Sequence, residues 1–338
     1  MQRKFGILGT LAALMIGVPF PSLAEVPQAR QSEPASMSPY RFKAAVENAT
    51  FEWFFLLVDA GRDQGIWAKN GLDPEFVSAA GSSAQLKERV ESGVKIGFIN
   101  AAEVTLARSN GVLVKTVAGY FGETTARIFV AAHGPIGAAK DLDGKRIGIV
   151  ATTHTSYRTV LYMNKRLTIK AEPVALGNLP NNVAALKTGH IDAFYSAEGA
   201  ALTLVDSGAV RLLLPLSDIY PKPYTAVVVW TTDDLIEQNP DLVTKFVRAT
   251  LEIVEYLKAN PRYASDLYVK RTNAPRNVSD RAVASLNQIL TPSGRGSGRD
   301  LVAAVAGNWQ FITESGAVPA GTAVNIEEVV DTRFLPRR

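Results

Sequence analysis

The chain contains no cysteine and only three histidines in 338 residues. The absence of cysteine excludes disulfides, thiolate catalysis, cysteine-based metal sites and the lipidated cysteine that tethers many exported proteins to a membrane. The three histidines are His133, His154 and His190, and no two of them have a spacing that metal ligands use. We therefore expect neither a metal site nor a cofactor.

Catalytic motifs are absent as well. The sequence has no G-x-S-x-G elbow, no H-E-x-x-H pair and no G-x-G-x-x-G turn, which mark many hydrolases, zinc proteases and dinucleotide-binding enzymes. An excess of one charge is also missing, because Lys and Arg total 36 against 32 for Asp and Glu. This near balance gives no support to a nucleic-acid partner. We expect a protein that is not an enzyme and does not bind nucleic acid.

The amino terminus has the three parts of a secretory signal peptide within residues 1–24. Arg3 and Lys4 form a basic start, Gly6 to Phe20 an apolar stretch, and Ser22-Leu23-Ala24 a small-residue cleavage site. The apolar stretch is shorter than the about 20 residues that a membrane span needs, and no later segment approaches that length and apolarity. We expect cleavage after this segment and a soluble periplasmic product.

After the leader, residues 25–39 are polar and proline-rich, so we expect a flexible lead-in. From Tyr40 onward, short β-branched or aromatic runs alternate with longer helical patterns, which is typical of an α/β protein with mostly parallel sheets. The expected strands are Glu75 to Ala79, Val94 to Asn100, Leu113 to Ala118, Ile128 to Ala132, Arg146 to Val150, Ala193 to Ser196, Val210 to Pro215 and Ala226 to Thr231. The expected helices are Phe54 to Asn70, Ala84 to Ser92, Ser156 to Lys165, Val183 to Thr188, Pro240 to Asn260, Asp280 to Leu290 and Asp300 to Ser315.

A weak internal similarity links two segments that lie 96 residues apart. In residues 90–101 the pattern predicts the end of a helix, then Gly93, then a short strand. Residues 186–197 show the same pattern, with Gly189 in the place of Gly93. Glycine at such a place suits the left-handed conformation that ends a helix. The similarity predicts two lobes of like topology, although any two helix–glycine–strand units share this pattern.

Hydroxyl groups gather where an expected strand leads into an expected helix. Thr152, Thr153, His154, Thr155 and Ser156 follow the strand that starts at Arg146 and lie at the start of a helix. The unpaired N–H groups of a first helical turn, together with several hydroxyls, form a site for an anion or a polar group. An ordinary helix cap is the alternative, and it needs only one hydroxyl.

The first half of the chain offers matching elements. Gly81, Ser82 and Ser83 follow one strand and precede a helix, and Phe51 and Trp53 follow the first strand, where an aromatic ring would stack on a ligand or join the core. Ligands of open α/β sheets bind outside the carboxyl ends of strands. The loops 51–53, 81–83, 152–156 and 196–198 are therefore expected to face one crevice. The candidate ligand-binding residues are Phe51, Trp53, Gly81, Ser82, Ser83, Asn100, Thr124, Thr152, Thr153, His154, Thr155, Ser156, Ser196 and Glu198.

Four segments resemble the periplasmic solute-binding proteins of ABC importers, in the NMT1/THI5-like branch that serves nitrate, taurine, alkanesulfonates and thiamine-pyrimidine precursors. They are Gly65-Ile66-Trp67-Ala68-Lys69-Asn70-Gly71-Leu72, Lys140-Asp141-Leu142-Asp143-Gly144-Lys145-Arg146-Ile147-Gly148, Ala185-Leu186-Lys187-Thr188-Gly189-His190-Ile191-Asp192-Ala193, and Asn239-Pro240-Asp241-Leu242 before a long helix. The order of the segments is that of the family across most of the mature chain. One departure is the stretch Gly93-Val94-Lys95-Ile96-Gly97, where the family usually has an aspartate.

The resemblance implies a two-lobed type II periplasmic-binding-protein fold, with a mostly parallel sheet flanked by helices in each lobe. Residues 40–123 and 222–338 would form lobe 1 and residues 124–221 lobe 2. The chain would cross between the lobes near 120–126 and return near 217–225. The implied partners are a small-molecule ligand and, transiently, an ABC permease in the inner membrane, with the protein itself a monomer.

The expected ligand is a small organic anion, such as a sulfonate, taurine or a carboxylate, bound by donors at the helix starts, with Arg127 as a further clamp. An aromatic or pyrimidine-like ligand is the alternative, since Phe51, Trp53, Tyr195 and Glu198 suit an aromatic or amine-bearing molecule. The resemblance is also compatible with a ligand-sensing periplasmic module and with a pyrimidine-synthesising enzyme.

Overall fold

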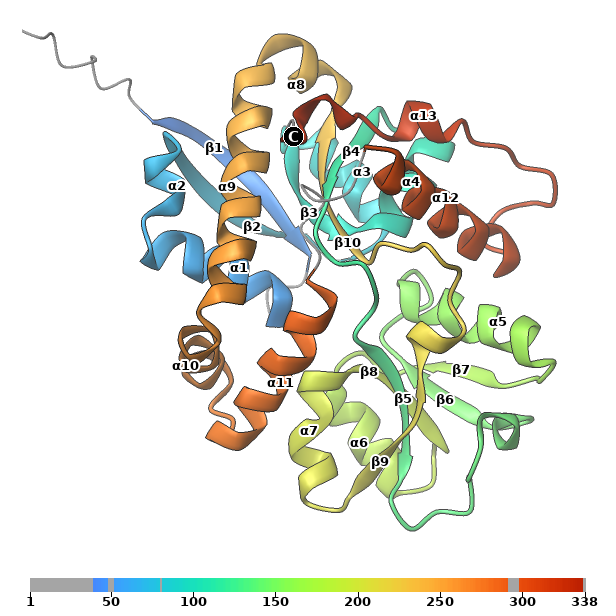
Figure 1. Cartoon of the computed structure of the whole chain (residues 1–338). Coiled ribbons are helices and arrows are strands. Elements are labelled where there is room, and N and C mark those ends of the chain that lie inside the picture. Colours follow the sequence, from blue (N-terminus) through green and yellow to red (C-terminus); the bar gives the residue numbers. More distant parts are fainter. Residues whose placement is uncertain (1–38, 48–51, 80, 291–297, 337–338) are drawn as a thin grey trace, which may run out of the picture. The chain divides into compact units, whose positions relative to one another are not determined.

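The computed structural model describes residues 39–47, 52–79, 81–290 and 298–336 (Figure 1). The expected signal peptide and nearly all of the expected lead-in lie outside the described residues, as do the side chains of residues 52, 53, 79 and 298. Among the described helices, none combines the length and the apolarity that a membrane crossing requires.

Ten strands form two five-stranded sheets. The first sheet has the order β2-β1-β3-β10-β4 and the second β7-β6-β8-β5-β9. The strands of the first sheet are β1 (Tyr40–Glu47), β2 (Leu72–Ala79), β3 (Ile96–Asn100), β4 (Val114–Gly119) and β10 (Val227–Thr232). Those of the second are β5 (Ala126–Ala131), β6 (Arg146–Ile149), β7 (Glu172–Ala175), β8 (Ala193–Ala197) and β9 (Val210–Pro215).

Each sheet has one reversed strand. In the first sheet β10 is antiparallel to both β3 and β4, and in the second β5 is antiparallel to both β8 and β9. The other strand pairs are parallel. The two reversed strands are the ones that the chain enters directly after it passes from one sheet to the other. The expected mostly parallel α/β architecture is therefore confirmed.

The two segments with similar sequences occupy equivalent positions. β3 is the central strand of the first sheet and β8 that of the second. The helix before each ends at a glycine with a positive φ, 86° at Gly93 and 70° at Gly189, which is the conformation that glycine adopts without steric cost.

The helices connect these strands and cover the sheets. Their bounds are α1 (Glu52–Asp63), α2 (Ile66–Lys69), α3 (Ser83–Glu91), α4 (Ala101–Ser109), α5 (Thr155–Leu167), α6 (Leu179–Lys187), α7 (Glu198–Asp206), α8 (Asp233–Gln238), α9 (Pro240–Ala259), α10 (Pro261–Thr272), α11 (Arg276–Ile289), α12 (Gly298–Glu314) and α13 (Ile326–Val329). The single helix predicted from Phe54 to Asn70 is wrong. Gly65 adopts φ 63° and separates α1 from α2, because a left-handed residue cannot continue a right-handed helix.

Alternating side chains of the first sheet belong to two apolar clusters. Phe98 of β3 and Val229 of β10 pack in one cluster with Phe246 of α9, and the rings of Phe98 and Phe246 stack at 5.2 Å. Their neighbours Ile99 and Val228 belong to a second cluster, which contains Val104 of α4. Successive strand residues point to opposite faces, so helices cover both faces of this sheet.

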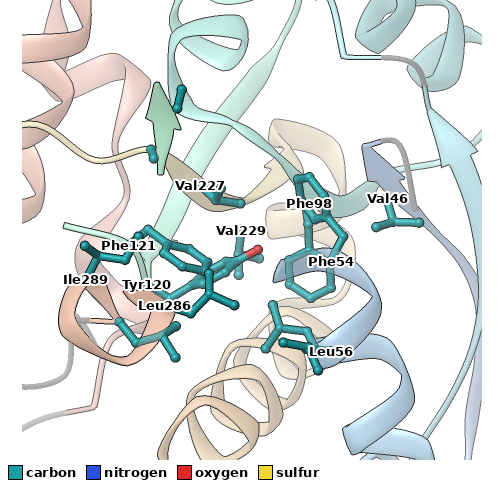
Figure 2. Packing of buried hydrophobic residues seen from close by; sticks show 14 of the residues in the cluster. Val46, Phe54, Leu56, Phe98, Tyr120, Phe121, Val227, Val229, Leu286 and Ile289 are labelled. Carbon is teal, nitrogen blue, oxygen red and sulfur yellow. The ribbon is translucent and has the colours of Figure 1, made fainter. Parts of the chain in front are cut away.

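The two segments that join the sheets lie side by side (Figure 1). The Phe121 carbonyl accepts hydrogen bonds from the N–H of Ala226 at 3.1 Å and from the hydroxyl of Thr225 at 2.9 Å. Gly122 N–H donates to the carbonyl of Ile289, at the end of α11, at 3.0 Å. Figure 2 shows Phe121 and Ile289 together at this place. These bonds tie the two connections to each other and to α11.

Candidate ligand-binding site

Loops from both sheets line one cavity of about 220 Å³. Ser78, Gly81, Ser82 and Gln85 line it from the end of β2 and the start of α3, and Val150, Ala151, Thr153 and His154 from the loop between β6 and α5. A second cavity, of about 20 Å³, is lined by Glu47, Phe54, Asn100 and Val227 from the first sheet and its helices, and by His154, Thr155, Tyr195 and Ala197 from the second. His154 belongs to both cavities, so the two adjoin at this side chain.

The tautomer of His154 follows from its role as the N-cap of α5. Its Nδ1 accepts a hydrogen bond from the N–H of Ser156 at 3.0 Å, and the Ser156 hydroxyl lies 3.0 Å from the same nitrogen. An accepting Nδ1 carries no proton in the neutral ring, so the proton is on Nε2. Nε2 lies 3.6 Å from Glu47 Oε1, which is too long for a hydrogen bond.

Glu47 is the last residue of β1, and its carboxylate is held in place from one side. Oε2 accepts the N–H of Asn100 at 2.7 Å, and only 5% of the residue is exposed. Within the described residues no hydrogen bond to Oε1 is found; this oxygen lies 3.6 Å from Nε2 of His154, and both residues line the small cavity. The site thus presents one acceptor and one donor next to each other.

Gly81 leaves the space that the Glu47 side chain fills. A Cβ atom at position 81 would overlap Glu47 from Cγ to Oε1. We expect Gly81→Ala to displace the carboxylate and to lower the free energy of unfolding by about 1–3 kcal/mol, as overpacking of a buried site does. Urea unfolding followed by circular dichroism measures this change. Gly134→Ala is the matched control, because its Cβ would make an ordinary contact with Ala131 at 3.4 Å. Equal stability of the two variants would contradict the expectation.

A second buried carboxylate, Glu103 of α4, joins elements of both sheets. Its residue exposure is 0%. Oε2 accepts the N–H of Ser83 at 2.9 Å, and Oε1 accepts the hydroxyl of Thr155 at 2.5 Å and a hydrogen bond from the guanidinium of Arg158. Ser83 begins α3, whereas Thr155 and Arg158 belong to α5. Glu103 therefore links the first turn of α3, which follows a strand of the first sheet, to the first turn of α5, which follows a strand of the second sheet.

The guanidinium of Arg158 is buried next to Glu103, with 7% of its side chain exposed. Burial lowers the pKa of Arg158 to about 10, which leaves the group protonated at neutral pH. Nη1 donates to the carbonyl of Thr153 at 3.4 Å, but Nε has no partner among the described residues. The Glu103 carboxylate is thus the main partner of this buried charge.

Tyr195 of β8 and Tyr220, which follows β9, border the same region. The ring of Tyr195 meets that of His154 edge-on, with centroids 6.4 Å apart. Burial, and then the nearby Tyr220 and Glu47, raise the pKa of the Tyr195 phenol well above its usual value. The hydroxyl of Tyr220 lies 2.5 Å from the hydroxyl of Thr159 on α5. These phenols are neutral at physiological pH.

A second set of contacts joins α7 of the second sheet to α11. Glu198 accepts hydrogen bonds from Arg127 at 3.0 Å and from the hydroxyl of Ser285 at 2.8 Å, and Asp206 pairs with Arg281 at 2.6 Å. Arg127 also donates to the carbonyls of Thr124 and Ala126. The guanidinium proposed as a ligand clamp is therefore engaged by the protein itself.

The structure brings part of the predicted site together. Gly81, Ser82, Asn100, Thr153, His154 and Thr155 line the two cavities. Ser83 and Ser156 are not among the lining residues: the Ser83 N–H binds Glu103, and the Ser156 hydroxyl accepts the N–H of Val150 at 3.1 Å. Phe51 and the side chain of Trp53 lie outside the described residues.

The remaining predicted residues line neither cavity. Thr152 is exposed. The Thr124 hydroxyl accepts the N–H of Ala126 at 3.1 Å, and that of Ser196 donates to the carbonyl of Ala197 at 3.1 Å. Glu198 is bound to Arg127 and Ser285. Each of these side chains has a local structural partner or lies at the surface.

Sequence reasoning missed Glu47, Glu103 and Arg158. Glu103 lies in the stretch Ala101 to Ala107, whose other residues are apolar except for Thr105. Arg158 lies among hydroxyl-bearing and apolar residues. A charged residue in such a stretch is the signal that would have drawn attention to them, because buried charges need a partner. Among the described residues no group of three or more His, Asp or Glu side chains is placed to hold a metal ion.

Comparison with known proteins identifies the family and the fold. The NMT1/THI5-like family matches residues 56–264. The riboflavin-binding protein RibY of Chloroflexus aurantiacus is 29% identical over 178 residues, an alignment that spans 52% of this chain and half the length of RibY.

Two solved structures show the same fold. The alkanesulfonate-binding protein SsuA of Xanthomonas axonopodis pv. citri, bound to MOPS, superposes with a TM-score of 0.71 at 15% identity over 88% of this chain and 99% of its own. The ligand-binding component of an ABC-type import system from Staphylococcus aureus has a TM-score of 0.65 at 14% identity, covering 87% and 97%. The expected periplasmic-binding-protein fold is thus confirmed. Because the family match covers more than half of the sequence, this chain belongs to the NMT1/THI5-like family.

Proposed function

We propose that this protein is a periplasmic solute-binding protein that delivers a small molecule to an ABC importer. The observation that carries the proposal is the cavity shared by the start of α3 and the loop before α5, since the two loops come from different sheets. A ligand there contacts both sheets at once and stabilises their closed arrangement, which a permease then recognises. Membership of the NMT1/THI5-like family and the likeness to an importer component support this reading.

The lobes of this proposal are residues 40–123 with 222–338, and residues 124–221. The proposal includes export through residues 1–24, action as a monomer, and binding without catalysis. Ligand binding would draw the lobes together around the connections at Phe121 and Ala226, which already hydrogen-bond to each other.

The lining of the cavities favours a solute with N–H groups over an oxyanion. Neither cavity is lined by Lys or Arg within the described part of the chain, and the smaller one carries the Glu47 carboxylate. An anion placed beside Glu47 meets a like charge, whereas an N–H group finds an acceptor there. The small organic anion expected from the sequence stays a prediction, and we propose the aromatic, nitrogen-bearing alternative in its place.

The hydrogen-bonding groups of Glu47 and His154 narrow the class of solute further. Oε1 of Glu47 accepts and Nε2–H of His154 donates, and the two atoms lie 3.6 Å apart. Amides, amidines and the edges of nitrogen heterocycles present a donor next to an acceptor and so complement this pair. Tyr195 and Phe54 add flat apolar surface beside it. The larger cavity, about 220 Å³, is below the about 300–1,000 Å³ of drug-sized pockets, so the solute is small.

A ligand screen tests the proposed function. Pyrimidines, flavins and small amides would be compared with sulfonates and carboxylates by thermal shift, because a ligand that binds only the native state raises Tm. We expect a rise for a nitrogen heterocycle and none for the oxyanions. A rise for sulfonates alone would support the anion class instead. No rise with any compound of the panel would contradict the proposed ligand class.

Replacing Glu47 by glutamine separates recognition from folding. A charge-assisted hydrogen bond contributes about 1.5–3 kcal/mol, so we expect Glu47→Gln to weaken binding of the best hit by about 10- to 100-fold. Isothermal titration calorimetry measures the affinity. The exposed Glu237 on α8 supplies the matched control, Glu237→Gln, whose affinity should equal that of the wild type. If both variants bind alike, Glu47 does not contact the solute.

A further inference from the structure

Donors that the sequence predicts for an anionic solute converge on a carboxylate of the protein itself. The N–H of Ser83, in the first turn of α3, and the hydroxyl of Thr155, in the first turn of α5, both bind Glu103. The guanidinium of Arg158, one turn further along α5, binds it as well. The donors therefore come from both sheets, as they would for a solute held between them.

This donor set is complete for one carboxylate. It contains a backbone N–H at a helix start, a hydroxyl and a buried guanidinium, which are the groups that proteins use to hold carboxylates, sulfonates and phosphates. The exposures of Thr155, Arg158 and Glu103 are 3%, 6% and 0%. Water therefore has little access to the charges, and each oxygen of Glu103 has at least one protein donor.

We propose that Glu103 is a built-in anion that occupies the anion-recognition donors of this site and so determines the class of solute. With Ser83, Thr155 and Arg158 engaged by Glu103, a solute oxyanion finds no free donor among them. The solute is then left with the neighbouring edge of Glu47 and His154. This inference rests on the proposed function for the identity of the solute site and adds the residue that excludes oxyanions from it.

The test removes the built-in anion and supplies a free one. Glu103→Ala deletes a CH₂COO⁻ group, which corresponds in size and charge to acetate. We expect acetate to raise the Tm of Glu103→Ala saturably, by about 5 °C at 100 times its dissociation constant. The wild type should show no saturable rise, because its donors are engaged. Methanesulfonate should behave like acetate if the donors accept oxyanions in general.

Two controls assign the effect to the donor set. Glu103→Gln keeps the volume of the side chain, so acetate has no space and should not bind. Glu103→Ala combined with Arg158→Met lacks the guanidinium, and it should lose the acetate-dependent rise. An equal response of Glu103→Ala, the double variant and the wild type would overturn the inference. If Glu103→Ala is unfolded without acetate, its refolding yield in acetate and in an equal concentration of chloride is compared, and equal yields would also overturn it.

The outcome is independent of the natural solute. Acetate rescue without any hit in the ligand screen would support the role of Glu103 and count against the proposed function. A nitrogen heterocycle that binds the wild type, with no acetate rescue of Glu103→Ala, would support the proposed function and overturn the role of Glu103.

Discussion

Replacing Arg158 by methionine is expected to lower the free energy of unfolding by about 3–5 kcal/mol. The change leaves the Glu103 carboxylate, with 0% exposure, without its charged partner, and breaking one side of a buried ion pair costs about this much. The N–H of Ser83 and the hydroxyl of Thr155 remain as donors, but neither carries a charge. Urea unfolding at pH 7 measures the loss.

A second variant and a surface pair complete this experiment. Glu103→Leu together with Arg158→Met removes both charges, and we expect it to recover most of the loss, since apolar replacements of buried ion pairs are often neutral. Lys69→Met breaks the pair between Lys69 and Glu252, whose side chains are 71% and 34% exposed, and it should cost about 0–1 kcal/mol. A loss below about 1 kcal/mol for Arg158→Met would show that the pair contributes little.

The fold could be predicted where strands are buried and continuous. β3, β10 and β8 read as apolar runs because both faces of each sheet are covered, and their predicted bounds differ from the observed ones by at most two residues. β7 was missed. It has four residues, includes Pro173 and lies at the edge of its sheet, so it has neither the length nor the apolar pattern of a buried strand.

The candidate site could be predicted only in part. The sequence shows where strands lead into helices, but the site also depends on contacts between residues that lie far apart in the chain. Strand-to-helix boundaries placed the loops at Ser82 and His154, which do line the larger cavity. Sequence does not show which donors find partners inside the protein. Glu103 lies 52 and 55 positions from Thr155 and Arg158, and only the fold brings them together. The hydroxyls predicted to bind an anion are therefore partly engaged by the protein.

Raising the pH above 10 is expected to destabilise the protein steeply. The phenols of Tyr120, Tyr220 and Tyr224 are 0%, 6% and 5% exposed, and burial raises the pKa of each above the usual value. Unfolding exposes them to water, where they ionise near pH 10. The stability that these neutral phenols provide is thus fully present below pH 10, and it is lost as the pH rises from 10 toward their folded pKa values.

Arg158 affects the pH dependence of stability in the opposite direction over the same pH range. Burial lowers its pKa from 12.5 to about 10, so between these values the unfolded chain binds one more proton at this residue than the folded protein does. Stability then rises with pH by about 1.4 kcal/mol per unit at this residue, whereas each of the three phenols lowers it by the same amount. The three phenols outweigh Arg158, and Tyr195, whose pKa burial also raises, adds to the loss, so the net loss is at least about 3 kcal/mol per pH unit above pH 10.

Urea unfolding at pH 9, 10, 10.5 and 11 measures this dependence, and absorbance at 295 nm reports which tyrosines ionise in the folded state. Tyr220→Phe removes one of the three phenols and leaves the ring, so its stability should fall less steeply, by about 1.4 kcal/mol per pH unit. Replacing the half-buried Tyr157 by Phe is the matched control for the loss of one phenol. Constant stability from pH 9 to 11 would mean that these phenols already ionise in the folded protein. The interior around Tyr120, Tyr220 and Tyr224 would then admit water in the folded protein.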